Sequence, residues 1–277
     1  MFSKPYFDRH GLIVALDGER AVGFAHAAFG PATDHGGIDT TVGTTLFVAV
    51  VPHADHDAIG RGLLERCEAY LRSRGATTLL GGGSADMRSF YLGLYGGSDL
   101  PGILDSSSDM QGIFRQCGYE VAERIAVLRR RLAGFRPPIN RLQVAIRRNT
   151  VLRVIDEPTR RTWWEAATTT GIALRRYELR NHSEEVLGTA SLWDMQPLAA
   201  AWGVTAAGLL HVAIEGQRRR QGLAKYLLAE AMHDLAQEGV SLMETHASTS
   251  NSAALALFES LGFETAEYGI VFRKPAG

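Results

Sequence analysis

The residues with the clearest potential for chemistry form a basic turn in the second half of the chain. Arg218 to Arg220 follow the predicted strand Leu209 to Ile214 and precede a segment of helical periodicity, so the sequence predicts a strand, a turn and a helix. The first amides of a helix are unpaired and carry partial positive charge, so such a turn can hold phosphate oxygens. Gly222 would let the backbone approach a pyrophosphate closely, and Ala224 would add little bulk. Taken alone, the turn is equally typical of a solvated basic surface.

A second motif begins at Asn251 and runs as a short predicted helix to Phe263. Together the two motifs resemble those of the GNAT superfamily of N-acetyltransferases, in which Arg/Gln-x-x-Gly-x-Gly/Ala follows the fourth strand. The family's second motif is Asn-x-x-Ala-x-x-Leu-Tyr-x-x-x-Gly-Phe. The chain matches the first motif as Arg219-x-x-Gly222-x-Ala224, and it matches the second with Phe258 in place of the tyrosine.

The resemblance implies an acetyl-CoA-dependent N-acetyltransferase. An amine would attack the thioester directly in a ternary complex, and fixed backbone donors would stabilise the oxyanion. The strand before the turn would pair with the pantetheine arm, the turn would hold the pyrophosphate, and Asn251 would contact the arm. The implied cofactor-binding residues are Val212, Ala213, Ile214, Arg219, Arg220, Gln221, Gly222, Leu223, Ala224, Asn251 and Phe258.

The general base and acid are less defined than the cofactor loop. The family's tyrosine protonates the leaving thiolate, but a thiol with a pKa of about 8.5 leaves tolerably without a strong acid, so water or Tyr268 could supply the proton. Histidine suits proton abstraction near neutral pH, and a histidine satisfied by hydrogen bonds is the alternative reading. The catalytic candidates are His211, His246, Glu244 and Tyr268.

An internal repeat relates the two halves of the chain. Gly60 lies 164 positions before Ala224, and the segment Ile113 to Glu120 lies 144 positions before Leu257 to Glu264. The first copy therefore carries about 20 additional residues, which include the glycine- and aromatic-rich segment Phe90 to Asp105. This insertion suits either acceptor recognition or packing between the copies.

We therefore predict an α/β (α+β) protein with two GNAT-like domains, each a mixed, mostly antiparallel sheet flanked by helices. Residues 1–135 would form a degenerate domain and residues 136–277 the acyltransferase domain with the acetyl-CoA site, joined near Arg136-Pro137-Pro138. The resemblance covers about Thr159 to Lys274 well and Gly11 to Leu132 weakly. Because the first copy lacks a counterpart of Thr159 to Thr170, we expect it to be trimmed or to borrow its first strand.

The first copy has lost the phosphate-binding equipment. Asp55 stands where the second copy has Arg219, and Ser107 stands where it has Asn251. A carboxylate beside a pyrophosphate costs about 1–4 kcal/mol at a surface-like dielectric. We expect Asp55 or Asp57 to cap the helix instead, which would occupy the amides that a phosphate needs.

The composition limits the partners. The 277 residues carry 29 basic and 30 acidic side chains, a net charge of −1, which argues against nucleic acid and acidic membranes as partners. No apolar run approaches the roughly 20 residues that span a bilayer, and we expect a cytoplasmic protein. Cys67 and Cys117 both align with apolar positions of the other copy, so we expect neither a metal site nor an acyl-cysteine.

The sequence leaves the acceptor open as a small-molecule or peptide amine, and it does not define the oligomeric state. A non-catalytic tandem CoA-binding scaffold or sensor is the alternative function. Phe258 and the undefined base are its main support. Release of free thiol from acetyl-CoA in the presence of amines separates the two functions.

Overall fold

The computed structural model describes residues 4–53, 55–92 and 97–275. The strands within these ranges are β1 (Leu12–Asp17), β2 (Arg20–Pro31), β3 (Ile38–Val50), β4 (Thr78–Gly81), β5 (Ile103–Leu104), β6 (Glu120–Arg131), β7 (Thr150–Asp156), β8 (Leu174–Asn181), β9 (Val186–Asp194), β10 (Ala206–Ile214), β11 (Leu242–Ser248) and β12 (Glu264–Arg273). The helices are α1 (His56–Ser73), α2 (Arg88–Tyr91), α3 (Ser108–Gln116), α4 (Arg141–Asn149), α5 (Trp163–Thr169), α6 (Ala199–Trp202), α7 (Leu223–Gln237) and α8 (Ser252–Ser260).

The two copies repeat each other in the predicted register. Helices α1 and α7 end 164 positions apart, at Ser73 and Gln237, and helices α3 and α8 begin 144 positions apart, at Ser108 and Ser252. The additional residues of the first copy lie between β4 and α3, where they form α2 and β5. The predicted fold class, with two GNAT-like units of mixed and mostly antiparallel sheet, is confirmed.

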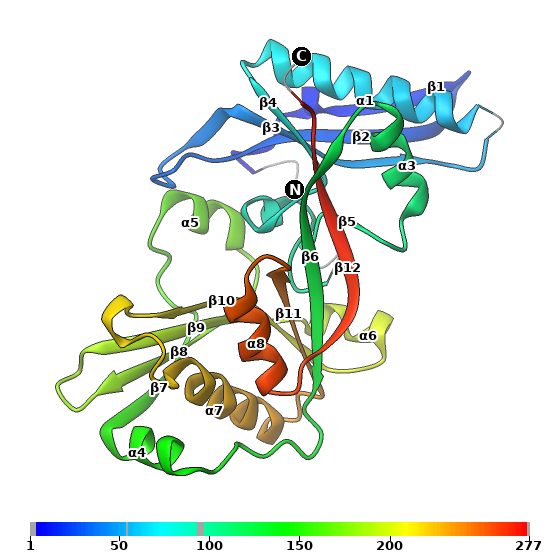
Figure 1. The fold of residues 1–277 in the computed structure, drawn as a ribbon. Coiled ribbons are helices and arrows are strands. Elements are labelled where there is room, and N and C mark those ends of the chain that lie inside the picture. Colours follow the sequence, from blue (N-terminus) through cyan, green and yellow to red (C-terminus); the bar gives the residue numbers. More distant parts are fainter. Residues whose placement is uncertain (1–3, 54, 93–96, 276–277) are drawn as a thin grey trace.

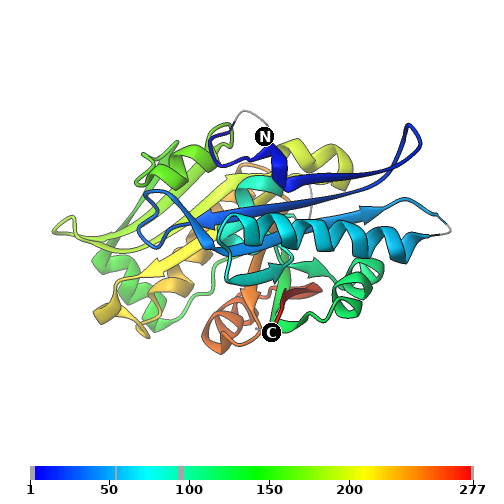
Figure 2. The same cartoon turned by 90° about the horizontal axis from the view of Figure 1, so that it is seen from above.

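All the strands of the described residues belong to one sheet, in the order β1-β2-β3-β4-β12-β6-β11-β10-β9-β8-β7, with β5 added beside β12. Most neighbours are antiparallel, whereas β3 pairs with β4 and β10 pairs with β11 in parallel. Helix α1 lies along β2 and β3 (Figure 2), and α7 occupies the matching place on the second copy. The first copy has no counterpart of β7 in the described residues, so it is trimmed at its outer edge.

The long strands β6 and β12 run side by side through the middle of the molecule, between the two halves (Figure 1). Each is the last strand of one copy and pairs with the other copy: β6 pairs with β11, and β12 pairs with β4. The apolar side chains follow the same exchange. Ala126 and Leu128 of β6 belong to the core of the second copy, while Ile270 and Phe272 of β12 belong to the core of the first.

The boundary between residues 135 and 136 stays a prediction, and the sheet and both cores continue across it. A further apolar cluster joins Tyr6, Phe90 and Leu100 of the first copy to Trp164 of α5. No helix of the described residues is long and apolar enough to cross a membrane.

Candidate functional site

A wedge opens between strands β10 and β11. Their parallel pairing is limited to Ala206 to Leu209 on β10 and Leu242 to Thr245 on β11. Beyond it, β10 stays with β9 and β11 stays with β6. Among the described strands, none pairs with the inner edge of Val212 to Ile214. Its backbone groups therefore face the wedge, as an edge strand ready to be extended.

The basic turn closes the wide end of this wedge. A short 3-10 helix, Gly216–Arg218, leads into Arg220 and Gly222, which have φ angles of 60° and 79°. The first hydrogen bond of α7 runs from the Tyr226 amide to the Gly222 carbonyl, at 3.0 Å. The amides of Leu223 and its successors in the first turn therefore have no acceptor in a preceding turn, so this end of the helix is able to accept an anion.

The wedge and the turn together form a groove of about 850 Å³. It brings together all the predicted cofactor-binding residues except Gln221, whose side chain donates to the Gln217 carbonyl at 3.2 Å. The groove is also lined by Arg218, Lys225, Thr245, Ala254 and both candidate histidines. Basic groups thus gather at the turn and apolar groups along the wedge, as a pyrophosphate followed by a pantetheine arm requires.

Helix α8 forms one wall of the groove. Asn251 caps it, because its Oδ1 accepts a hydrogen bond from the Ala254 amide at 3.1 Å. Phe258 is buried and its ring centroid lies 5.3 Å from that of Phe263. The residue at the family's tyrosine position thus lines the groove with an apolar ring and offers no proton.

Glu244 is fully buried on β11, outside the lining of the groove. Its carboxylate accepts a hydrogen bond from the Ser98 amide and one from Arg129 Nε, each at 2.6 Å. His246 Nε2 lies 3.6 Å from the same carboxylate. Burial raises the pKa of Glu244, but His246 and these two donors outweigh it and lower the pKa below its ordinary value. Glu244 is therefore held as a carboxylate.

The two histidines occupy different parts of the site. The His246 side chain is only 6% exposed and lines the groove. His211 is exposed on β10, just after a bulge in the pairing with β9. It lines both the groove and a second cavity of about 410 Å³ under α5. His211 and Leu210 therefore mark the place where the two hollows meet.

Tyr268 is separated from these groups. It lies on β12, with the Arg124 guanidinium 4.4 Å from its ring centroid, and it lines neither hollow. Strand β6 lies between β12 and the wedge strand β11. The structure thus brings His211 and His246 to the groove, places Glu244 behind His246, and leaves Tyr268 outside.

The first copy has the same splayed strands, but its wedge is filled. Strands β3 and β4 pair only from Val42 to Thr45 on β3. Beyond this point the Val48 amide donates to the sulfur of Met110, at 3.4 Å. Met110 is buried on α3 and occupies the position of Ala254 in the second copy. Its side chain therefore occupies the first wedge where the second wedge stays open beside Ala254.

The helix start of the first copy also differs. Helix α1 begins at His56, three positions earlier than α7 in the repeat, because Ala58 stands where Gly222 breaks the helix in the second copy. The expected carboxylate cap is wrong. Asp55 occupies the cap position, but its side chain makes no capping hydrogen bond, and Asp57 pairs with His56 at 3.2 Å instead. The helix simply extends through the residues that would form the turn.

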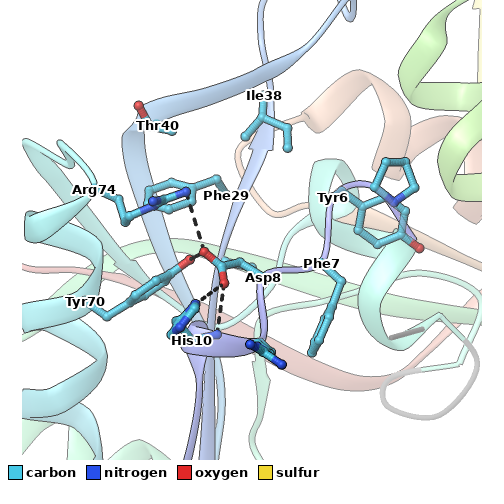
Figure 3. Close-up of a pocket in the computed structure, with 12 residues that line it drawn as sticks. Tyr6, Phe7, Asp8, His10, Phe29, Ile38, Thr40, Tyr70 and Arg74 are labelled. Carbon is cyan, nitrogen blue, oxygen red and sulfur yellow. Dashed lines mark hydrogen bonds and ion pairs between the residues drawn. The ribbon is translucent and has the colours of Figure 1, made fainter. Parts of the chain in front are cut away.

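Figure 3 shows a separate hollow of about 640 Å³ on the first copy, between the N-terminal segment, the β2–β3 hairpin and α1. Its polar groups converge on Asp8, which accepts hydrogen bonds from the His10 amide at 2.9 Å and from the Tyr70 hydroxyl at 3.0 Å, with Arg74 at 3.6 Å. These contacts fasten the N-terminal segment to α1. The hollow shares no lining residue with the groove.

Two parts of the site were missed by the sequence reasoning. The first is the set of Glu244 partners, Ser98 and Arg129, which come from the first copy and carry no local signal. The second is the cavity under α5. Thr162 Oγ1 accepts from the Glu165 amide at 3.1 Å, and Glu165 accepts from the Arg161 amide at 2.7 Å. This capping arrangement, readable as Thr-x-x-Glu, could have located the helix.

Comparison with known proteins identifies the class. The model of the acetyltransferase (GNAT) family matches residues 3–93 and 145–263, which together make up most of the chain. The chain therefore belongs to the acetyltransferase (GNAT) family. The two matched regions correspond to the two copies.

Similar curated proteins match only over a short segment. The ribosomal protein bS18-alanine N-acetyltransferase of Escherichia coli (strain K12) is 40% identical over 60 residues, which are 22% of this chain and 40% of that protein. The mycothiol acetyltransferase of Kocuria rhizophila is 37% identical over 62 residues, which are 22% of this chain and 20% of that protein. The matches thus span less than half the length of these relatives.

Similar solved structures share the whole architecture. A tandem GNAT protein from the clavulanic acid biosynthesis pathway superposes with a TM-score of 0.65 at 16% identity, over 95% of this chain and 82% of that one. A GCN5-related N-acetyltransferase from Sphaerobacter thermophilus gives 0.63 at 17% identity, over 95% and 79%. At these identities the likeness establishes the fold.

Proposed function

We propose that the second copy alone binds acetyl-CoA, in the groove between β10 and β11, and transfers the acetyl group directly to an amine in a ternary complex. The observation that carries this proposal is the contrast between the two wedges. The second is open and ends in a turn of free helical amides and arginines, whereas Met110 and an extended α1 fill the first.

The groove suits each part of the donor. The amides at the start of α7 and Arg218 to Arg220 would hold the pyrophosphate, and the inner edge of Val212 to Ile214 would pair with the pantetheine arm. This places the thioester near the bulge at Leu210, where fixed backbone donors can stabilise the developing oxyanion. Family members use acetyl-CoA as the acyl donor, and no other described hollow combines these features.

The amine would approach from the cavity under α5, which meets the groove at Leu210 and His211. His211 or His246 would accept its proton. Glu244 would orient His246, because a carboxylate with a lowered pKa is a poor base at neutral pH. With Phe258 in the groove, water would protonate the leaving thiolate. The acceptor would be a small-molecule or peptide amine, and a cytoplasmic location would supply the donor.

Steady-state kinetics with acetyl-CoA and an amine panel, followed by thiol release, test this function. Double-reciprocal plots should intersect, and kcat/KM should rise with pH and level off as the base loses its proton. His211→Gln or His246→Gln should remove that inflection, whichever is the base. Binding of CoA without thiol release for any amine would favour the scaffold function, and parallel plots with a trapped acyl-cysteine would overturn direct transfer.

A further inference from the structure

The cavity under α5 has a buried cation at its inner end. Arg176 lies on β8 with 11% of its side chain exposed, and it lines the cavity together with Trp164, Leu174 and Leu210. Within the described residues its guanidinium has one ionic partner, Glu165, at 3.6 Å, and it donates no hydrogen bond. A guanidinium has five N–H donors, so donors of Arg176 remain available to a ligand.

Another arginine on the same strand, Arg180, forms a hydrogen-bonded ion pair with a carboxylate. Arg180 donates to the buried Glu178 carboxylate through Nε at 3.1 Å and Nη2 at 2.6 Å. Arg176 has no such contact, and none of its nitrogens is a fully buried atom without a partner, so its N–H groups are open to the cavity. Glu165 is itself turned toward the Arg161 amide, at 2.7 Å. It therefore limits the position of Arg176 and leaves its N–H groups facing the cavity.

Strand register aligns this cation with the transfer site. Arg176 is paired with Ser191 on β9, and Ser191 is paired with His211 on β10. Directly paired residues face the same side of a sheet, and all three side chains line the cavity. A cation, a hydroxyl and an imidazole thus form a row across three strands, and the row ends where the cavity opens into the groove.

The length of this row limits how far apart the carboxylate and the amine of a bound ligand can be. Two strand spacings separate the backbones of Arg176 and His211 by about 10 Å. The two side chains start from these backbones and line the same cavity, so a small ligand that contacts both must carry its carboxylate and its amine close together. Short amino acids meet this requirement. The cavity volume of about 410 Å³ suits such small ligands.

The carboxylates of Asp86 and Glu165 also line the cavity, together with a second arginine, Arg161. Asp86 and His35 of the first copy line it, with Asp86 exposed at the mouth. A cavity with a buried cation at one end and a carboxylate at its mouth is complementary to a zwitterion. The first copy therefore supplies part of the wall on which an ammonium group would enter.

We propose that Arg176 binds the carboxylate of the acceptor, so that the amines acetylated by this chain are short amino acids. This inference rests on the proposed function and specifies its substrate class. It also assigns to the first copy a part in the acceptor site.

The test uses a matched pair of amines, β-alanine and β-alaninamide, compared at equal concentrations of free amine with the full chain and acetyl-CoA. We expect kcat/KM to be on the order of 10–100-fold higher for β-alanine, the effect of a charge-assisted hydrogen-bonded pair. Arg176→Met should abolish this preference and Arg176→Lys should restore part of it. Arg153→Met, which removes an exposed arginine paired with Glu184, should leave the preference intact.

Calorimetry separates the failure of this inference from failure of the proposed function. Arg176→Met should bind CoA as the unmodified chain does, which also shows that it is folded, and should lose binding of β-alanine measured in the presence of CoA. Equal kcat/KM for the two amines, absence of β-alanine binding, or a preference that survives Arg176→Met would overturn the role of Arg176. Absence of CoA binding by the unmodified chain would instead overturn the proposed function.

Discussion

One of the differences between the two wedges is a single side chain on the helix that lines each of them. Ala254 lines the open groove of the second copy, and the equivalent Met110 accepts a hydrogen bond from Val48 inside the closed wedge of the first. The difference of three heavy atoms lies where a pantetheine arm would pair with the strand. The capacity of each copy to bind CoA therefore depends on the size of this residue as well as on the basic turn.

Ala254→Met should close the groove of the second copy. Because the methionine would occupy the pantetheine path, we expect CoA affinity measured by calorimetry to fall by at least about 100-fold, the effect of roughly 3 kcal/mol of lost contacts. Ala256→Met changes an exposed position of the same helix outside the groove and should leave affinity unchanged. One CoA site per chain is expected before the change; two sites would show that the first wedge also binds.

At the scale of elements, the insertion of the first copy, Phe90 to Asp105, contacts residues of the second copy. Ser98 donates its amide to Glu244 and accepts a hydrogen bond from Trp193 Nε1, at 3.0 Å. Gly97 has a φ of +79°, and a Cβ there would collide with the Glu244 carboxylate. The described part of the insertion thus lies directly behind the proposed catalytic histidine, which keeps both its recognition role and its packing role as predictions.

Trp193→Phe removes the indole donor to Ser98 while keeping an aromatic ring. We expect faster hydrogen exchange at the amides of residues 98–100 and an acceptor KM raised severalfold, because one hydrogen bond that fixes the insertion is lost. The CoA affinity should stay constant and serves as the internal control. Faster exchange with an unchanged acceptor KM would assign the insertion to packing alone.

The sequence is most informative where the chemistry is local. The turn before α7 and the cap of α8 are each contained in a few consecutive residues, so their motifs located the groove. Arg129 and Ser98 reach the site from the first copy, and the row beginning at Arg176 depends on the register of three strands of the second copy. Neither arrangement has a signature in consecutive residues. Helix α4 and strand β7, which extend the second copy, were not predicted. Both are short and largely exposed, so their apolar periodicity is weak.

At the scale of the whole molecule, Lys274 near the end of the second copy forms an ion pair with a helix of the first copy. Lys274, just after β12, donates to both oxygens of the buried Glu68 on α1, at 2.6 and 2.8 Å. Arg72 contributes a third hydrogen bond at 2.9 Å. A residue of the second copy therefore compensates a carboxylate in the core of the first.

Lys274→Met should destabilise the chain by about 2–3 kcal/mol, less than a fully buried pair because the lysine is partly exposed. Urea unfolding should measure the loss, and hydrogen exchange should rise in α1 although the change lies at the other end of the sequence. CoA affinity should be retained. Faster exchange confined to α7 would contradict the exchanged arrangement.

Strands β6 and β12, which each pair with the other copy, also limit which parts of the duplicated chain can be deleted. Because β6 of the first copy completes the sheet that carries the groove, deletion of the first copy would remove a central strand and part of the core from the second. A substitution that merely fills the first wedge leaves that strand in place. A filled wedge in the first copy is therefore compatible with retention of its backbone, and the two copies persist or disappear as a single unit.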